Sequence, residues 1–90
     1  MTKELRRTTR FKKDYKREQK THRDLGDLLR PVLQLLLDGE ALPERLRDHA
    51  LGGAWKDHRD CHIKPDLVLI YSVDDAAVTV VRLGSHSELF

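Results

Sequence analysis

The sequence has little cysteine and no long apolar run. Its one cysteine, Cys61, has no partner within the chain for a disulfide. No apolar stretch approaches the roughly 20 residues that a helix needs to cross a bilayer. The first ten residues, MTKELRRTTR, also lack the apolar segment of a secretory signal. We therefore expect a cytoplasmic protein with no membrane partner.

Internal repeats, low-complexity tracts and interdomain linkers are also absent. A chain of 90 residues has room for one small core, because it buries only about 60% of its unfolded surface. Apolar residues at 39% supply that core and charged residues at 36% supply a polar surface, which excludes disorder and fibrous structure. We expect a single globular domain over residues 1–90.

Positive charge is concentrated near the N-terminus, although the formal net charge is only +2. Among the first thirteen residues, Glu4 is the one acid, and six residues are basic: Lys3, Arg6, Arg7, Arg10, Lys12 and Lys13. Such a cluster attracts phosphate backbones by counterion release, but a charge run is as often a solvated face. Charge alone leaves RNA, DNA and an acidic protein open as partners.

The apolar pattern predicts a short edge strand and two helices in the first half of the chain. Residues 3–9 suit only an edge strand, since Leu5 is their one large apolar residue. Residues 11–20 are typical of a basic amphipathic helix, with Thr8 or Thr9 as its N-cap. In residues 25–37, leucine and valine recur at i, i+3, i+4 and i+7, which predicts a helix with one buried face. Gly39 marks its end, while Pro31 either lies near its first turn or bends it.

Three strands are predicted after a loop around Pro43, over residues 54–59, 67–73 and 78–83. Asp74 and Asp75 indicate a turn between the last two. The nearly continuous apolar run of residues 67–73 is typical of a central strand buried on both faces, or nearly so, with helices packed on one side. The predicted order is β-α-α-β-β-β, an α+β domain.

Four of the five histidines lie in the second half of the chain, namely His49, His58, His62 and His86. Imidazole exchanges protons near neutral pH and also binds metal ions. A zinc site would need His58 and His62, at i and i+4, on a helix. Their segment is instead typical of strand and turn, where such positions lie about 13 Å apart, and Cys61 would point to the opposite face. The spacing disfavours zinc, and we expect no cofactor.

The alternative is acid and base catalysis on RNA, in which the 2′-OH of the substrate is the nucleophile and no metal is needed. This chemistry requires a base for the 2′-OH, an acid for the departing 5′-oxygen, and a cation beside the phosphate as negative charge develops. Histidine and Arg82 supply these chemical types. Each of them taken alone is better explained as an ordinary surface residue, so the joint pattern must decide.

Two motifs provide that joint pattern. The first covers residues 48–71 and reads D-H-x-L-x-G-x-W, then R-D-x-H-x-x-P-D, then an apolar L-I-Y strand. The second covers residues 82–90 and reads R-x-G-x-H-x-x-L-F. Together and in this order, they resemble the signature of YafQ-type toxins of the RelE superfamily. The resemblance is close over residues 48–90, while the first half is similar in element order and helix pattern.

The resemblance implies a RelE-like, microbial-ribonuclease-like fold, in which helices pack on a twisted antiparallel sheet whose concave face holds the site. It implies the toxin of a type II toxin–antitoxin system, an endoribonuclease that cuts mRNA in the ribosomal A site and inhibits translation. The implied partners are the ribosome with its rRNA, the mRNA substrate, and a DinJ- or RelB-like antitoxin. The antitoxin's C-terminal segment would wrap the toxin and block or distort its site.

Matched by position, the resemblance assigns functional roles to His49, His62, Asp66, Arg82, His86 and Phe90. We expect His86 to be the principal acid or base, with His49 and His62 as companions in proton transfer or phosphate binding. Arg82 would be the transition-state cation. Asp66 would orient a histidine, and Phe90 would stack on a base. We also assign Lys56 and Arg59 to RNA binding.

Other residues near the motifs fall outside these roles. Some relatives carry Trp where this chain has Leu67, so a stacking surface is absent at that position. His58 and His22 match no functional position of the family, and we expect His58 to be an exposed strand residue.

Two functions of other kinds remain as alternatives. A ParE-like relative that poisons DNA gyrase would share the fold but would not need this set of histidines. A non-catalytic module that only binds an antitoxin would not need it either, so the presence of every polar site residue favours the ribonuclease.

Overall fold

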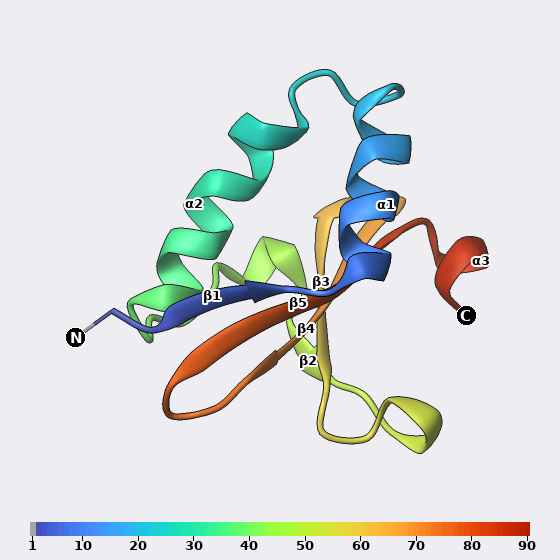
Figure 1. Ribbon diagram of the computed structural model, residues 1–90. Helices are drawn as coiled ribbons and strands as arrows, with labels where there is room; N and C mark the ends of the chain where they lie inside the picture. The colour runs from blue at the N-terminus through green and yellow to red at the C-terminus, as the bar shows by residue number, and fades with distance from the viewer. Residues whose placement is uncertain (1) are drawn as a thin grey trace.

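A mixed five-stranded sheet with helices packed against it forms the fold, and the computed structural model describes residues 2–90 (Figure 1). In chain order, the helices and strands are β1 (Glu4–Arg7), α1 (Thr9–Gln19), α2 (Leu25–Leu37), β2 (His49–Ala50), β3 (Arg59–Lys64), β4 (Leu67–Val73), β5 (Ala77–Gly84) and α3 (His86–Leu89). Two short 3-10 helices flank β2, namely η1 (Glu44–Leu46) and η2 (Gly53–Trp55). The α+β class predicted from the sequence is confirmed.

The strands lie in the order β1-β5-β4-β3-β2, so β4 is central and β1 is an edge, as predicted. Pairing is antiparallel between β2 and β3, β3 and β4, and β4 and β5. In contrast, β1 runs parallel to β5, with Glu4 opposite Ala77. The expectation of an antiparallel sheet therefore fails for this one pair. Nearly the whole chain separates β1 from β5, so no tight turn imposes an antiparallel direction on them.

Local sequence determines the ends of the two long helices. Thr8 is the N-cap of α1, and its hydroxyl accepts a hydrogen bond from the Phe11 N–H at 3.0 Å. The same hydroxyl donates to the Val81 carbonyl of β5 at 2.8 Å, which fastens the helix start to the sheet. The chain leaves α2 through Gly39, whose φ of 73° is in the left-handed region that favours glycine. Pro31 lies in the interior of α2, beyond its first turn.

Residues 54–59, which we predict as a strand, do not form one. The chain makes the turn η2 there and passes through Asp57 with a φ of 70°, which is not strand geometry. The strand β3 begins at Arg59, and its signal is the alternation of polar residues with Cys61 and Ile63. The elements β2 and α3 are also absent from the prediction, because two and four residues are too few to show a period.

Apolar side chains cover both faces of β4, which confirms it as a buried central strand. On the face toward α1 and α2, Leu69 and Tyr71 pack with Phe11, Leu25 and other helix residues. On the opposite face, Val68 and Ile70 pack with Leu89 of α3. No helix within residues 2–90 is long and apolar enough to cross a membrane.

Candidate active site

His49 and His62 lie on the face of the sheet that turns away from α1 and α2. Residues paired directly across antiparallel strands point to the same face. One row across the sheet consists of His49, Asp60, Ile70 and Arg82. The next row consists of His62, Val68 and Gly84. Since Val68 and Ile70 belong to the cluster with α3, His49, His62 and Arg82 share that face.

His86 comes to this face from α3, which begins two residues after Gly84. The ring centroids of His62 and His86 are 5.1 Å apart, so the two imidazoles are immediate neighbours. The ring of Phe90 follows at 5.8 Å from His86, and this side chain is 55% exposed. Two imidazoles and an exposed aromatic ring therefore form one continuous surface.

A pocket of 510 Å³ opens beside the two imidazoles. Its lining consists of Arg45, Leu46, Arg47, His62, Ile63, Lys64, Pro65 and His86. Three of these residues are cationic and none is acidic, so the pocket suits an anion.

His49 is held by two contacts to the same ring nitrogen. Its Nδ1 lies 2.9 Å from the Arg47 carbonyl oxygen and 3.0 Å from Oδ1 of Asp60. The carbonyl has the hydrogen-bond geometry, while Oδ1 of Asp60 is buried and otherwise has no hydrogen-bond partner in the described chain. Donation of Nδ1–H to Arg47 leaves Nε2 available for a ligand. Asp60 supplies a buried negative charge beside the ring.

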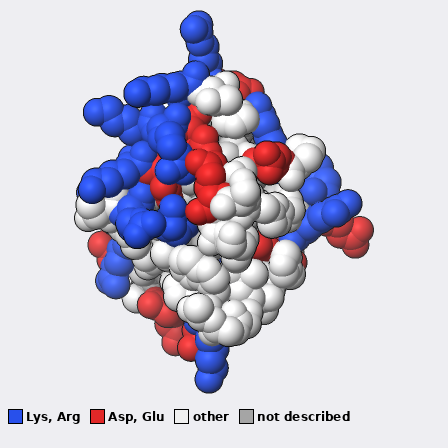
Figure 2. Space-filling view, turned by 90° about the vertical axis from the view of Figure 1, so that its right-hand side faces the viewer, with Lys and Arg blue, Asp and Glu red and all other residues white. Residues whose placement is uncertain are grey.

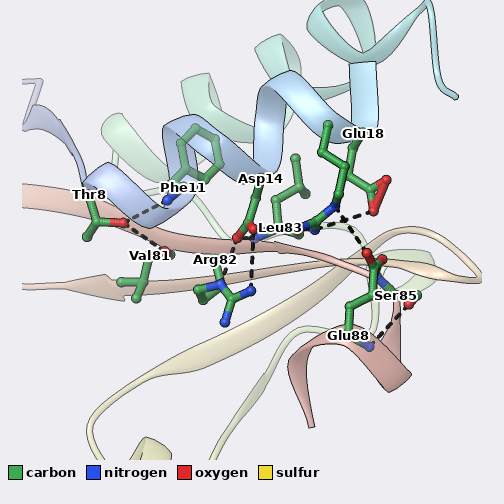
Figure 3. Close-up of polar contacts among 10 residues, drawn as sticks. Thr8, Phe11, Asp14, Glu18, Val81, Arg82, Leu83, Ser85 and Glu88 are labelled. Carbon is green, nitrogen blue, oxygen red and sulfur yellow. Dashed lines mark hydrogen bonds and ion pairs between the residues drawn. The ribbon is translucent and has the colours of Figure 1, made fainter. Parts of the chain in front are cut away.

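Arg82 is fixed by a carboxylate from α1 (Figure 3). Its Nε and Nη2 donate to Asp14 at 2.7 and 3.3 Å, and the Leu83 N–H donates to the same carboxylate at 3.1 Å. Burial acts to raise the pKa of Asp14, but the bonds from Arg82 and Leu83 outweigh it and the pKa lies below its ordinary value. The Arg82 side chain is only 13% exposed, so its guanidinium has a set orientation.

A bulge in β5 explains how Arg82 reaches the histidine face. Ile70 pairs with Arg82 and Tyr71 pairs with Val80, so Val81 has no partner on β4. One extra residue in a strand shifts the following side chains to the other face. The unpaired Val81 carbonyl accepts from the Thr8 hydroxyl instead.

A network around Arg17 joins α3 to α1. Nε of Arg17 lies 3.1 Å from Oε2 of Glu88, and Nη2 donates to the Leu83 carbonyl at 3.2 Å. Burial raises the pKa of Glu18, and the neighbouring Glu88 raises it further. A Cβ on Gly84 would lie 3.1 Å from the Arg17 guanidinium and 3.2 Å from Glu88, so glycine permits this close approach. The helix that carries His86 is thus tied to the body of the protein.

The short helix α3 depends on a capping box. The Ser85 hydroxyl accepts from the Glu88 N–H at 3.3 Å, and the Glu88 carboxylate accepts from the Ser85 N–H at 2.9 Å. The pKa of Glu88 lies below its ordinary value, and the hydrogen bond from the Ser85 N–H is the largest cause of this lowering. A helix of four residues has little stability of its own, so these bonds set the position of His86.

Replacing Ser85 with alanine should loosen α3. Loss of an N-cap costs about 1 kcal/mol, so the amide protons of Glu88, Leu89 and Phe90 should exchange about fivefold faster. Hydrogen exchange followed by NMR measures this directly. Ser72→Ala, the same change on β4 and outside α3, should leave these rates near those of the unaltered chain. Equal acceleration in both variants would contradict the capping role.

Within residues 2–90, three of the residues assigned from the sequence form no hydrogen bond with the imidazole pair. Arg59 points to the other face of the sheet, where its guanidinium pairs with Asp48 at 3.1 and 3.2 Å. Lys56 is exposed in the turn before β3. Asp66 is exposed in the turn between β3 and β4, and within residues 2–90 no hydrogen bond joins it to a histidine.

Two acidic residues with a clear place in the site are absent from the prediction. Asp60 occupies the position expected of Asp66, beside a histidine. The sequence could have indicated Asp60, because this residue alternates with His62 in β3 and lies within the first motif. Asp14 gives no such signal, because an acid in a basic helix is ordinarily a surface residue.

Cys61 lies on the face opposite to its neighbour His62, as predicted. It is completely buried, and burial raises the pKa of its thiol to about 12. Across residues 2–90, no three His, Cys, Asp or Glu side chains gather in a group that could hold a metal ion. His58 is half-buried against Trp55 just before β3, so the expectation of an exposed strand residue is wrong for it.

A sequence model of the family described as "Bacterial toxin of type II toxin-antitoxin system, YafQ" matches residues 3–90. The chain belongs to the YafQ toxin family. The match covers all the strands and helices, including the basic N-terminal half.

Individual YafQ relatives agree in sequence and in structure. The mRNA interferase toxin YafQ of Escherichia coli is 39% identical over 80 residues, which are 89% of this chain and 87% of the relative. A copper-bound variant of a toxin from Helicobacter pylori is 43% identical, with both chains fully covered and a TM-score of 0.91. The E. coli DinJ–YafQ toxin–antitoxin complex contains a chain that is 35% identical, with coverage of 100% and 99% and a TM-score of 0.89.

Proposed function

We propose that this YafQ-family toxin is an endoribonuclease that cleaves mRNA on the ribosome, without a metal, and so inhibits translation. The observation that carries the proposal is the pair formed by His62 and His86, whose rings lie 5.1 Å apart beside a basic pocket. The name mRNA interferase, which the E. coli relatives carry, supports the same activity.

Two imidazoles side by side suit the transfer of two protons in one reaction. A base takes the proton of the 2′-OH, the 2′-oxygen bonds to phosphorus, and the bond from phosphorus to the 5′-oxygen breaks as an acid protonates that oxygen. One proton enters the protein and one leaves it. The products carry a 2′,3′-cyclic phosphate and a free 5′-OH, and the reaction consumes no water and needs no enzyme nucleophile.

We assign His86 as the principal acid or base and His62 as its companion, because their rings are adjacent. His49 is a second companion, with Nε2 free to meet the substrate while Nδ1–H is held by Arg47. When His49 carries a proton, the buried carboxylate of Asp60 balances the charge at 3.0 Å. Asp60 thus takes the orienting role that we expect of Asp66, while Asp66 stays a candidate for contacts made only with RNA bound.

Arg82 is the cation proposed for the developing charge on the phosphate. Its bidentate bond to Asp14 leaves Nη1 for the substrate and fixes the plane of the guanidinium. Preorganised donors of this kind stabilise a transition state without reorganisation during the reaction. Phe90, exposed beside His86, is placed to stack on a base, and Lys56 is exposed for a phosphate contact. Arg59, paired with Asp48, has a structural role in this proposal.

The partner proposed for the toxin is a DinJ-like antitoxin, by analogy with the E. coli complex. Five basic residues lie in α1, namely Arg10, Lys12, Lys13, Lys16 and Arg17. Lys and Arg gather on the upper part of the side where α1 and α3 lie (Figure 2). This charge would attract an acidic antitoxin segment, and in the free toxin it would attract rRNA. Action on ribosomes places the proposed toxin in the cytoplasm.

Expression of the chain in bacterial cells without an antitoxin tests this function. Growth should stop, and primer extension on cellular mRNA should reveal new 5′ ends at positions set by the reading frame. Breaks in DNA without such RNA ends would identify a gyrase poison instead. Normal growth at full expression would identify a non-catalytic binding module.

A further inference from the structure

We propose that Arg45 and Arg47 form a phosphate-binding subsite for the RNA strand that is cleaved beside His62 and His86. The proposal rests on the endoribonuclease function above and deepens it, because it identifies the residues that hold the substrate. Neither arginine belongs to the two motifs of the sequence, yet both line the 510 Å³ pocket with the two imidazoles.

Three other cations, Arg82, Arg59 and Lys64, already have acidic partners. Arg82 is bonded to Asp14 at 2.7 Å, and Arg59 is bonded to Asp48 at 3.1 Å. Nζ of Lys64 lies 3.6 Å from Asp24. Within residues 2–90, no carboxylate forms an ion pair with Arg45 or Arg47, and both are exposed. Their charge is therefore the least compensated in the pocket.

The two arginines flank a buried leucine in the chain. Leu46, between them, is 6% exposed and packs in the core. The turn η1 ends at Arg47, whose N–H donates a hydrogen bond to the Glu44 carbonyl at 2.9 Å. The same residue accepts the Nδ1–H of His49 through its own carbonyl. The subsite and His49 are therefore built on one rigid turn.

Arg47 also adopts an unfavourable backbone conformation. Its φ and ψ are 50° and 44°, in the left-handed region where a Cβ crowds the carbonyl. Glycine or asparagine would suit this position better. Backbone strain of this kind is concentrated at functional sites, where the surrounding structure holds it in place.

A phosphodiester is the ligand that fits this arrangement. The guanidinium group presents parallel N–H donors that match two phosphate oxygens. The pocket offers no acid that would repel such an anion. Because the arginines share the pocket with His62 and His86, the phosphates they hold belong to the strand being cleaved, next to the scissile phosphate.

The test measures binding of a fluorescent 2′-O-methyl oligoribonucleotide, which lacks the attacking hydroxyl and cannot be cleaved. Anisotropy titrations at several salt concentrations give the affinity and its dependence on salt. Arg45→Gln and Arg47→Gln should each lower the affinity about threefold to tenfold and make the slope of log K against log salt less steep by about 0.7. Arg30→Gln, the same charge change at an exposed site on α2, should alter neither quantity.

A second variant at position 47 separates the side chain from the backbone. Arg47→Gly removes the guanidinium but suits the left-handed conformation, so the carbonyl that holds His49 stays in place. This variant should lose as much affinity as Arg47→Gln. Binding restored by glycine would show that the backbone alone was responsible and would overturn the proposal.

Ribosomes without mRNA provide the second arm of the experiment. If Arg45→Gln and Arg47→Gln weaken binding to empty ribosomes but not to the oligonucleotide, the arginines hold rRNA and the proposal is overturned. The cleavage assay on the unaltered chain is independent of both arms. Unaltered affinity and slope in both glutamine variants of a toxin that cleaves mRNA would overturn the subsite alone. Reduced slopes in a chain that cleaves nothing would support the subsite and reject the ribonuclease.

Discussion

Replacement of His86 with alanine should lower the rate of mRNA cleavage by about 10²- to 10⁴-fold, the typical contribution of a general acid or base. The imidazole of His86 lies next to that of His62, and both line the basic pocket. A single-turnover assay on programmed ribosomes measures the chemical step separately from binding. The side chain is exposed, so the free energy of unfolding should change little.

His58→Ala is the matched control, since it removes a histidine from the same half of the chain but outside the pocket. In the unaltered chain the His58 ring contacts Trp55, whereas the imidazole pair consists of His62 and His86. The control should cleave within about twofold of the unaltered chain. A folded His86→Ala variant with undiminished cleavage would contradict the assignment, and so would equal losses in the two variants.

Replacement of Asp14 with alanine should destabilise the fold by about 3 to 5 kcal/mol, the cost of leaving a buried charge without its partner. The carboxylate accepts from both Arg82 and the Leu83 N–H, and Arg82 is only 13% exposed. Urea unfolding measures the change. Asp27→Ala, which breaks an exposed pair with Arg30 on α2, should cost less than about 1 kcal/mol.

Cleavage by the Asp14→Ala variant, under conditions where it is folded, should fall as well, because Arg82 loses its fixed orientation. In the double variant with Arg82→Ala, the buried guanidinium is removed together with its partner, while Arg17, which also pairs with Asp14, keeps Glu88. The two stability losses should therefore not add. A cost for Asp14→Ala as small as that of Asp27→Ala would show that the carboxylate does not hold Arg82.

The contribution of Asp14 to stability should also depend on pH. The pKa of Asp14 is lowered in the folded protein from its ordinary value of 3.8. Its ionised form therefore stabilises the fold above that value, and the stabilisation is lost as pH falls through the lowered pKa. The difference in unfolding free energy between the unaltered chain and Asp14→Ala should be constant above about pH 5 and shrink at lower pH. A constant difference down to pH 2 would contradict this linkage.

Much of the fold and part of the site could be predicted from sequence because the relevant signals are periodic and local. The strand at residues 67–73 and the helix at residues 25–37 depend on apolar repeats that packing reinforces. Alternation in β3 likewise separates Cys61 from His62. Such features follow from neighbours in the chain.

The partners of the site residues could not be predicted in the same way, since they come from distant segments. Asp14 and Arg82 are 68 positions apart, and their bond depends on how α1 lies against β5. The bulge at Val81 turns Arg82 toward the histidines, and no feature of the sequence composition indicates this bulge. Arg47 is similar, because its left-handed conformation is unfavourable for arginine and runs against local preference.

The position of β5 in the sheet has a consequence for the synthesis of the protein. This strand, formed by residues 77–84, bonds to β1 on one side and to β4 on the other, and α3 follows it. A growing chain that ends before residue 77 therefore has β1 without its neighbour and lacks His86 and Phe90. It cannot complete the sheet, and under the roles proposed for His86 and Phe90 it cannot cut RNA. Under the proposed function, a ribosome that makes this protein therefore meets no active toxin until residues 77–90 have left it and folded.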